Sequence, residues 1–278
     1  LIGAYGTGDK PVITNGNISI QTADWRVVDI FFTGASQAER TWSVGLITGV
    51  GSVDALFLRT DVRWSWMLAR FENVNGVYLV DSVLGLVSDQ GATRGYANWA
   101  AGASRISFLG SRLHGSDAHT ARWQGVDTAV CSNCTFDEPK GPEAWSMFTI
   151  RGKSNDGNNG VWNGLWTENV VVSDTVVRSG PPTAYAAFSA APQNAESAER
   201  LRNVLFERNH VIGLANGAAA FGVATGLTVR SNILQTLGGN GVAIEAKSTA
   251  GSPDMSQAFF YNNTHYKSNT TVNTSFDA

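Results

Sequence analysis

The chain has 278 residues and a formal net charge of −3 at pH 7, and only 15% of its residues are charged, against about 25% in an ordinary globular protein. This balance provides no global basic field, so we expect no nucleic-acid partner. No apolar run approaches the ~20 residues with which a helix crosses a bilayer, so we also expect no membrane span.

A short phrase recurs along the chain, in the order apolar, any, apolar, any, any, small polar. Its copies occupy residues 28–33, 56–61, 77–82, 106–111, 129–134, 170–175, 204–209, 227–232 and 258–263. The closing residues are Thr33, Asp61, Ser82, Ser111, Cys134, Thr175, Asn209, Asn232 and Asn263, separated by 28, 21, 29, 23, 41, 34, 23 and 31 positions. A repeat of this length with period-2 alternation predicts a coil that stacks on its own copies.

A second strand is predicted before each copy of the phrase. These strands lie at 43–47, 67–71, 96–100, 120–124, 147–151, 185–190, 218–223 and 242–247. Each coil therefore has at least two short strands that pair in parallel with those of the next coil, about 4.8 Å away. We expect one all-β solenoid of about nine to eleven coils over residues 1–278, with loop insertions and no long helix. The chain opens on a strand-like segment, and we interpret it as a fragment that lacks the first coils.

The closing residues are expected to stack from coil to coil in a column, here called the closing column. This column is predicted to mark a bend in every coil. Asn and Ser side chains at a bend hydrogen-bond backbone groups that the turn leaves without partners. Asn209 and Asn232 are therefore expected to be structural. Cys131 falls on an inward position and Cys134 on the closing column, which favours two reduced thiols in the core over a metal or redox pair.

Three segments carry a resemblance to a known family: IGAYGTG at 2–8, AHTAR at 118–122 and PQNAESAERLRN at 192–203. With the repeat, they resemble the right-handed parallel β-helix superfamily, whose members include pectate-lyase-like polysaccharide enzymes. The resemblance implies a right-handed coil, a polysaccharide or oligosaccharide partner, and a secreted, cell-surface or periplasmic location. The calcium-site motif of the pectate lyases is absent, so no cofactor is assigned and Ca²⁺ stays open. Related bacterial proteins have Lys and His where this chain has WSMFT at 145–149.

An arginine-rich stripe is predicted on one face of the coil. The positions twelve residues before Ser82, Ser111 and Cys134 are Arg70, Trp99 and Arg122. They should stack on consecutive coils and face solvent. Arg151 is expected to continue the stripe in the next coil, because a shift of two residues keeps a side chain on the same face of a strand.

Two further groups extend this predicted site. His119 and Lys153 are expected at the edges of the stripe, and Trp123 is expected to offer a flat face to a sugar ring beside Trp99. The longest insertion, between Cys134 and Thr175, adds Glu143 and Trp145. The site is therefore predicted in a groove between the face of Arg122 and residues 137–166.

Other interpretations of these residues stay open. Arg70 could pair with Glu72 or Asp89 as an ordinary surface ion pair, and Arg122 with Asp117 or Asp127. The segment His-x-x-Asp-x-His, formed by His114, Asp117 and His119, has the residue types of a metal site, although such a site needs converging ligands.

The function expected from these residues is a polysaccharide lyase that cleaves a uronate-containing glycan by β-elimination. Arg122 and Arg151 would neutralise the uronate carboxylate, and Lys153 or His119 would remove the neighbouring proton. Substrate binding is assigned to Arg70, Trp99, Trp123, Glu143 and Trp145. The alternatives are a glycoside hydrolase with two carboxylates, and a non-catalytic carbohydrate-binding or adhesion module. We expect a monomer.

Overall fold

The computed structural model describes most of the chain, and every regular element in the described part is a β-strand. The described residues are 1–4, 7–14, 18–20, 22–34, 46–48, 51–65, 67–87, 95–139, 146–152, 166–179, 186–191, 200–213, 217–237, 244–246, 256–267 and 274–276. Over these ranges there is no helix with the length and apolar character needed to cross a membrane.

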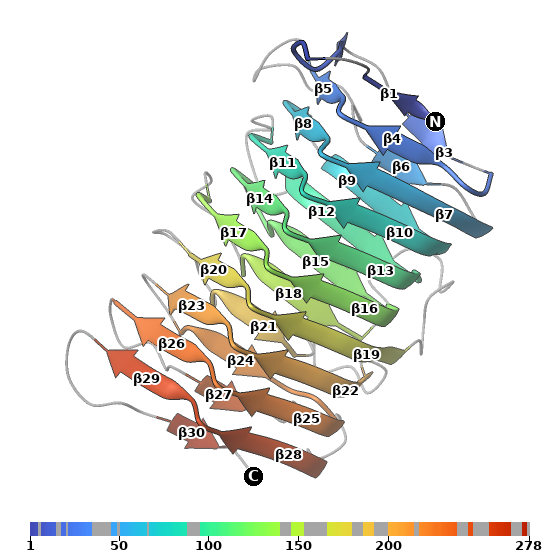
Figure 1. Cartoon of the computed structure of the whole chain (residues 1–278). Helices are drawn as coiled ribbons and strands as arrows, with labels where there is room; N and C mark the ends of the chain where they lie inside the picture. Colours follow the sequence, from blue (N-terminus) through green and yellow to red (C-terminus); the bar gives the residue numbers. More distant parts are fainter. Residues whose placement is uncertain are drawn as a thin grey trace.

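Thirty strands form three parallel sheets of ten strands each (Figure 1). Sheet A contains β1 (Ile2–Gly3), β4 (Arg26–Val28), β7 (Gly51–Leu58), β10 (Val74–Val80), β13 (Ser104–Leu109), β16 (Asp127–Ser132), β19 (Trp166–Ser173), β22 (Arg200–Glu207), β25 (Thr225–Arg230) and β28 (Ser256–Tyr261). Sheet B contains β2 (Val12–Thr14), β5 (Phe31–Thr33), β8 (Asp61–Arg63), β11 (Val83–Gly85), β14 (Arg112–His114), β17 (Thr135–Asp137), β20 (Val176–Arg178), β23 (His210–Gly213), β26 (Ile233–Thr236) and β29 (Thr264–Lys267). Sheet C contains β3 (Ile18–Ile20), β6 (Leu46–Thr48), β9 (Met67–Glu72), β12 (Tyr96–Ala101), β15 (Ala121–Gln124), β18 (Phe148–Arg151), β21 (Phe188–Ala190), β24 (Ala219–Phe221), β27 (Ile244–Ala246) and β30 (Thr274–Phe276).

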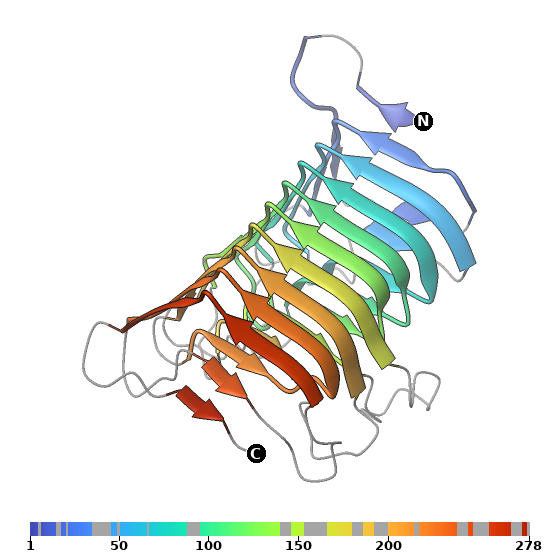
Figure 2. The same cartoon turned by 60° about the horizontal axis from the view of Figure 1, so that its bottom comes forward.

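Each strand pairs with the strand three places further along the chain, so one coil consists of one strand from each sheet. Figure 2 shows the coils stacked in chain order, with the two termini at opposite ends of the stack. The fold is a right-handed parallel β-helix, as predicted. The short strands of sheet B were missed by the sequence analysis, because three residues carry too little alternation to be recognised as a strand.

The interior of the coil is filled by apolar side chains stacked in columns. Along sheet C one column alternates large and small residues, from Phe71 through Ala100 and Trp123 to Ile150, and all four are fully buried. Trp123 packs edge-to-face on Phe148, with ring centroids 4.9 Å apart. Aromatic pairs in this arrangement contribute about 0.5–1.5 kcal/mol beyond their buried area.

A ladder of polar side chains follows the bend between sheets A and B. The residue before each rung of the ladder has a positive φ, as at Asp174 and Arg208. This leaves a backbone N–H for the next side chain along the stack: Thr175 N donates to Asn209 Oδ1 at 3.0 Å, and Asn209 N donates to Asn232 Oδ1 at 2.9 Å. The structural role predicted for Asn209 and Asn232 is confirmed.

The first two copies of the phrase were placed in the wrong register. Thr60, not Asp61, stacks below Ser82, since Thr60 N donates to Ser82 Oγ at 3.0 Å. Asp61 already belongs to sheet B, where it pairs with Val83. Thr33 is likewise a sheet B residue, paired with Arg63. The error at Asp61 follows from choosing between two adjacent polar residues. At the first copy the position that corresponds to Thr60 is the apolar Ile30, since Val28 pairs with Leu58, so a search for a polar residue passed over it.

The two cysteines are buried and free, as expected. Cys134 stands on the ladder, and its backbone N–H donates to Thr175 Oγ1 at 3.4 Å. Its Sγ lies 3.3 Å from the carbonyl oxygen of Phe108. Cys131 points into the core with no exposed surface.

Candidate functional site: the outer face of sheet C

Three of the four residues of the predicted stripe lie in one column of sheet C. Trp99 of β12 is in register with Arg70 of β9 on one side and with Arg122 of β15 on the other. All three side chains are half-buried, so each retains contact with solvent. The twelve-residue count is correct here, because the segment from Arg70 to Cys134 keeps a constant distance between sheet C and the bend.

Arg70 is held by two neighbours on this face. Its guanidinium carbon lies 5.0 Å from the centroid of the Trp99 ring, in a cation–π contact. Its Nη2 also forms an ion pair with Glu72, two residues further along β9. The alternative that Arg70 pairs with Glu72 is therefore confirmed, and part of the charge of Arg70 is compensated locally.

Gln124 fixes the other edge of the Trp99 ring. Trp99 Nε1 donates to Gln124 Oε1 at 3.1 Å. Gln124 is fully buried although it points away from the core, and its Nε2 has no hydrogen-bond partner among the described residues. A buried donor without a partner carries a free-energy cost of about 1–3 kcal/mol.

Arg151 lies one column away from its predicted place. The residue in register with Arg122 is Thr149, and Arg151 is in register with Gln124. Arg151 remains on the outward face but is only 7% exposed. Its Nε donates to Thr149 Oγ1 at 3.2 Å, so the expectation that it extends a solvent-facing stripe is wrong.

His119 does not lie at an exposed edge of the stripe. It is 1% exposed and stacks on Tyr96, with ring centroids 6.0 Å apart. Nδ1 lies 2.8 Å from the carbonyl oxygen of Ser146 and must donate to it, because a carbonyl only accepts. Nε2 then carries the lone pair and accepts from Arg151 Nη2 at 3.3 Å. Burial, followed by the nearby charges of Arg151 and Arg122, holds the pKa of His119 well below its ordinary value.

Trp123 is a core residue, which corrects its assignment to sugar binding. It is fully buried in the aromatic interior, and its Nε1 donates to Asn98 Oδ1 at 3.0 Å. Strand alternation requires this result, because Trp123 follows Arg122 directly and must point to the opposite face. Three other predicted site residues, Glu143, Trp145 and Lys153, lie outside the described residues, as does most of the predicted groove wall.

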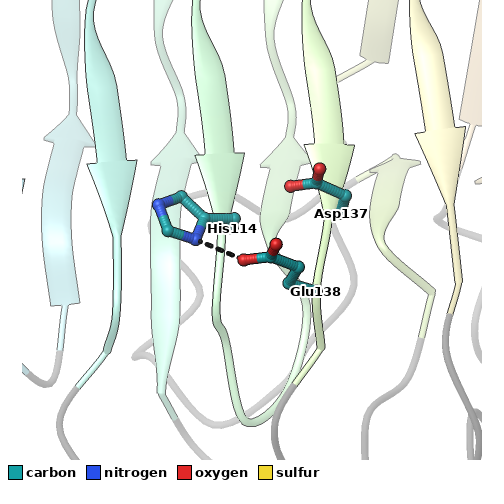
Figure 3. A group of neighbouring side chains, drawn as sticks. All are labelled: His114, Asp137 and Glu138. Carbon is teal, nitrogen blue, oxygen red and sulfur yellow. Dashed lines mark hydrogen bonds and ion pairs between the residues drawn. The ribbon is translucent and has the colours of Figure 1, made fainter.

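The alternative of a metal site formed by His114, Asp117 and His119 is not supported by the positions of the three residues. Of these three, His114 alone joins a grouping of possible metal ligands in the described part of the chain, together with Asp137 and Glu138. His114 Nδ1 lies 3.2 Å from Glu138 Oε2 (Figure 3). Counting forward one coil from His114, instead of along the loop to His119, would have found this grouping in the sequence.

A shallow groove of about 480 Å³ lies on sheet A and was not predicted. Its lining includes Asn169, Asn203, Thr228 and Tyr261, one from each of four strands that are adjacent in sheet A. Asn203 Nδ2 donates to Asn169 Oδ1 at 3.1 Å. Both residues have a positive φ, a conformation that Asn tolerates better than most residues do.

Comparisons with known proteins find a distant structural likeness. No family model and no curated protein matches the chain. Among solved structures, the chain is similar to PfbA, a surface adhesin of Streptococcus pneumoniae, with 12% identity and a TM-score of 0.41. The alignment covers 90% of this chain and 57% of the adhesin. At this level of identity the likeness assigns no activity.

Proposed function

We propose that the chain is a non-catalytic carbohydrate-binding or adhesion module that holds an acidic glycan on the outer face of β9, β12 and β15. The observation that carries the proposal is the register that places Trp99 between Arg70 and Arg122 on consecutive strands. Because adjacent strands lie about 4.8 Å apart, one aromatic face and two cationic groups stand within about two rungs. This alternation suits a row of sugar rings that carry carboxylates or sulfates.

Trp99 is the platform of the proposed site. Its ring is held by the guanidinium of Arg70 on one side and by the hydrogen bond to Gln124 on the other. A ring that is already fixed loses little conformational entropy when a ligand stacks on it, and preorganisation of this kind raises affinity. The flat apolar face of a sugar ring is a suitable partner for an aromatic side chain that is half-buried and retains contact with solvent.

Arg122 supplies the polar contact. The planar guanidinium of Arg122 matches a carboxylate or sulfate with two parallel hydrogen bonds. Gln124, two positions further along β15 on the same face, is fully buried. Its role is to position the Trp99 ring through the hydrogen bond from Trp99 Nε1.

Binding is favoured over β-elimination by the state of His119. A lyase needs a base that reaches the substrate. The lone pair of His119 accepts from Arg151 Nη2, and its ring is buried. Hydrolysis would need two carboxylates roughly 5–10 Å apart across the scissile bond, and Glu72, on the described part of this face, is engaged by Arg70.

The test is a titration of the chain with alginate, pectate and a neutral glucan oligomer. Arg122→Ala is expected to weaken binding of the two acidic glycans about 10–100-fold, which corresponds to the loss of a charge-assisted hydrogen bond, and to leave neutral binding almost unchanged. Arg105→Ala is the control, because Arg105 is an exposed arginine on sheet A, where it forms an ion pair with Asp54.

If Arg122→Ala lost the same affinity for acidic and for neutral glycans, Arg122 would not recognise the charge of the glycan, which contradicts the proposal. Ultraviolet absorbance of an unsaturated product, measured in the same incubations, separates the classes of function. Appearance of that product, and its loss in Lys153→Ala, would overturn the non-catalytic reading in favour of a lyase. A secreted or cell-surface location, where acidic polysaccharides occur, accompanies the proposal.

A further inference from the structure

A histidine and two carboxylates meet on sheet B, away from the proposed glycan face. His114 ends β14 and Asp137 ends β17, and the two residues are in register on adjacent strands. Glu138 follows Asp137 directly. One ligand atom from each of the three residues lies within 4.8 Å of the others, and Figure 3 shows the imidazole and both carboxylates directed toward a common region.

The imidazole of His114 is seated by the strand on its other side. It occupies the space above Gly85 of β11, where an added Cβ would lie 2.0 Å from His114 Nε2. His114 is 8% exposed, so the ring has little freedom to turn. This seating directs Nδ1 toward Glu138, at 3.2 Å.

Arg112 is the local cation of this cluster. Its Nε and Nη2 lie 3.1 and 3.2 Å from the two carboxylate oxygens of Asp137. Its Nη2 also lies 2.9 Å from Glu138 Oε1. The Arg112 side chain is 41% exposed, so it has room to swing into solvent when another cation takes its place.

We propose that His114, Asp137 and Glu138 bind a divalent transition-metal ion of the Zn²⁺ type, which displaces Arg112 from the two carboxylates. One imidazole nitrogen and two carboxylate oxygens form a common set of protein ligands for Zn²⁺, with water completing the coordination. A nitrogen ligand disfavours Ca²⁺ and Mg²⁺, which take oxygen ligands. The ion would link the ends of β14 and β17, and this role is independent of glycan binding.

The experiment uses the chain without a histidine tag, dialysed against a chelator and titrated with Zn²⁺ in a calorimeter. We expect about one ion per chain at this site. His114→Gln and Asp137→Asn should each weaken binding about 100-fold, since even the loss of a group that only orients a ligand costs 10–100-fold. The matched control is His210→Gln, because His210 lies on the same sheet but contacts Gln235 and not a carboxylate.

Two further variants separate a metal site from a merely structural cluster. Arg112→Ala should bind Zn²⁺ more tightly, because it removes the competing cation. Gly85→Ala should weaken Zn²⁺ about 10–100-fold without changing any ligand, because the added methyl group displaces the imidazole. Circular dichroism and the thermal midpoint in chelator establish that each variant is folded.

Opposite results would overturn the proposal. They are wild-type Zn²⁺ affinity in folded His114→Gln, an equal loss in His210→Gln, or weaker Zn²⁺ binding in Arg112→Ala. Ca²⁺ binding that depends on Asp137 but not on His114 would also overturn it, in favour of a purely acidic site. Glycan titrations run in chelator keep the two proposals separate, because failure of either one leaves the other measurement unaffected.

Discussion

Two arginines on the outer face of sheet C occupy neighbouring columns and have different surroundings. Arg122 is half-buried and lies in the column of Trp99. Arg151, one strand further and one column across, is 7% exposed and donates to Thr149 and His119. Register decides the face to which a side chain points, whereas exposure depends on what covers that face. A shared column is therefore necessary but not sufficient for a shared binding surface.

Trp99 and Trp123, on the neighbouring strands β12 and β15, give the largest expected contrast in stability. Trp123→Ala should lower the free energy of unfolding by about 3–5 kcal/mol, because it opens a cavity in the aromatic core and removes the donor to Asn98. Trp99→Ala should cost less, about 1–2 kcal/mol, because it leaves the buried Gln124 Oε1 without its donor, while reducing glycan affinity. Urea denaturation and glycan titration of both variants test this pair. A large stability loss in Trp99→Ala would show that the platform is part of the core.

Arg151→Ala and Arg122→Ala should also differ in their effect on the free energy of unfolding, by a smaller amount than the two tryptophan variants. Arg151→Ala is expected to cost about 2–3 kcal/mol, because Thr149 Oγ1 and His119 Nε2 lose a buried donor. Arg122→Ala should stay within about 1 kcal/mol and act on glycan binding instead. Urea midpoints at neutral pH measure both effects. If Arg122→Ala were the more destabilising variant, Arg122 would be a structural residue and the proposed face would lose its main anion contact.

The sequence predicted the coil and most of its register, but not the environment of each side chain. Ser82, Ser111 and Cys134 end phrases in coils without long insertions, so counting back from them located Arg70, Trp99 and Arg122 correctly. The count failed at Arg151 because an insertion between β18 and β19 lengthens the distance back from Thr175. Trp123 was assigned to the surface against the alternation that had placed Arg122 there. The approach of His119 to Ser146 and Arg151 spans 27 and 32 residues, and no local pattern encodes such contacts.

His114 shows a second limit of sequence reasoning. Its partners Asp137 and Glu138 lie one coil away, and the same rung arithmetic that aligned Trp99 with Arg122 also aligns His114 with Asp137. Only the column of Trp99 was aligned in this way from the sequence. In a solenoid, residues of successive coils should be aligned in every column, because contacts between coils recur at each position of the repeat.

The buried state of His119 should appear in the pH dependence of stability. Its pKa is depressed in the folded chain, so below an unfolded-state value of about 6.5 the unfolded chain binds the additional proton. Its contribution to stability is complete above pH 6.5 and is lost as the pH falls toward the folded-state pKa, by up to about 1.4 kcal/mol per pH unit. His114 and His265 shift in the same direction, so the quantity to measure is the difference between the wild type and His119→Gln.

Urea midpoints between neutral and mildly acidic pH provide that comparison. The wild type should lose more stability than His119→Gln as the pH falls. His210→Gln, which leaves the buried histidine in place, should follow the wild type. Parallel curves for the wild type and His119→Gln would mean that His119 is accessible to protons in the folded chain. A base that reaches solvent would then reopen the lyase interpretation.

The smallest effect concerns the exposed end of the stripe, where Arg70 pairs with Glu72. Glu72→Gln should change stability by less than about 1 kcal/mol, because partly exposed ion pairs contribute little. Removal of the carboxylate leaves the charge of Arg70 available to a ligand while the stacking on Trp99 persists. We therefore expect acidic glycans to bind a few-fold more tightly, and neutral glucans to bind unchanged, with the difference shrinking as salt is added. Unchanged affinity for acidic glycans at low salt would confine anion recognition to Arg122 and shorten the proposed site by one rung.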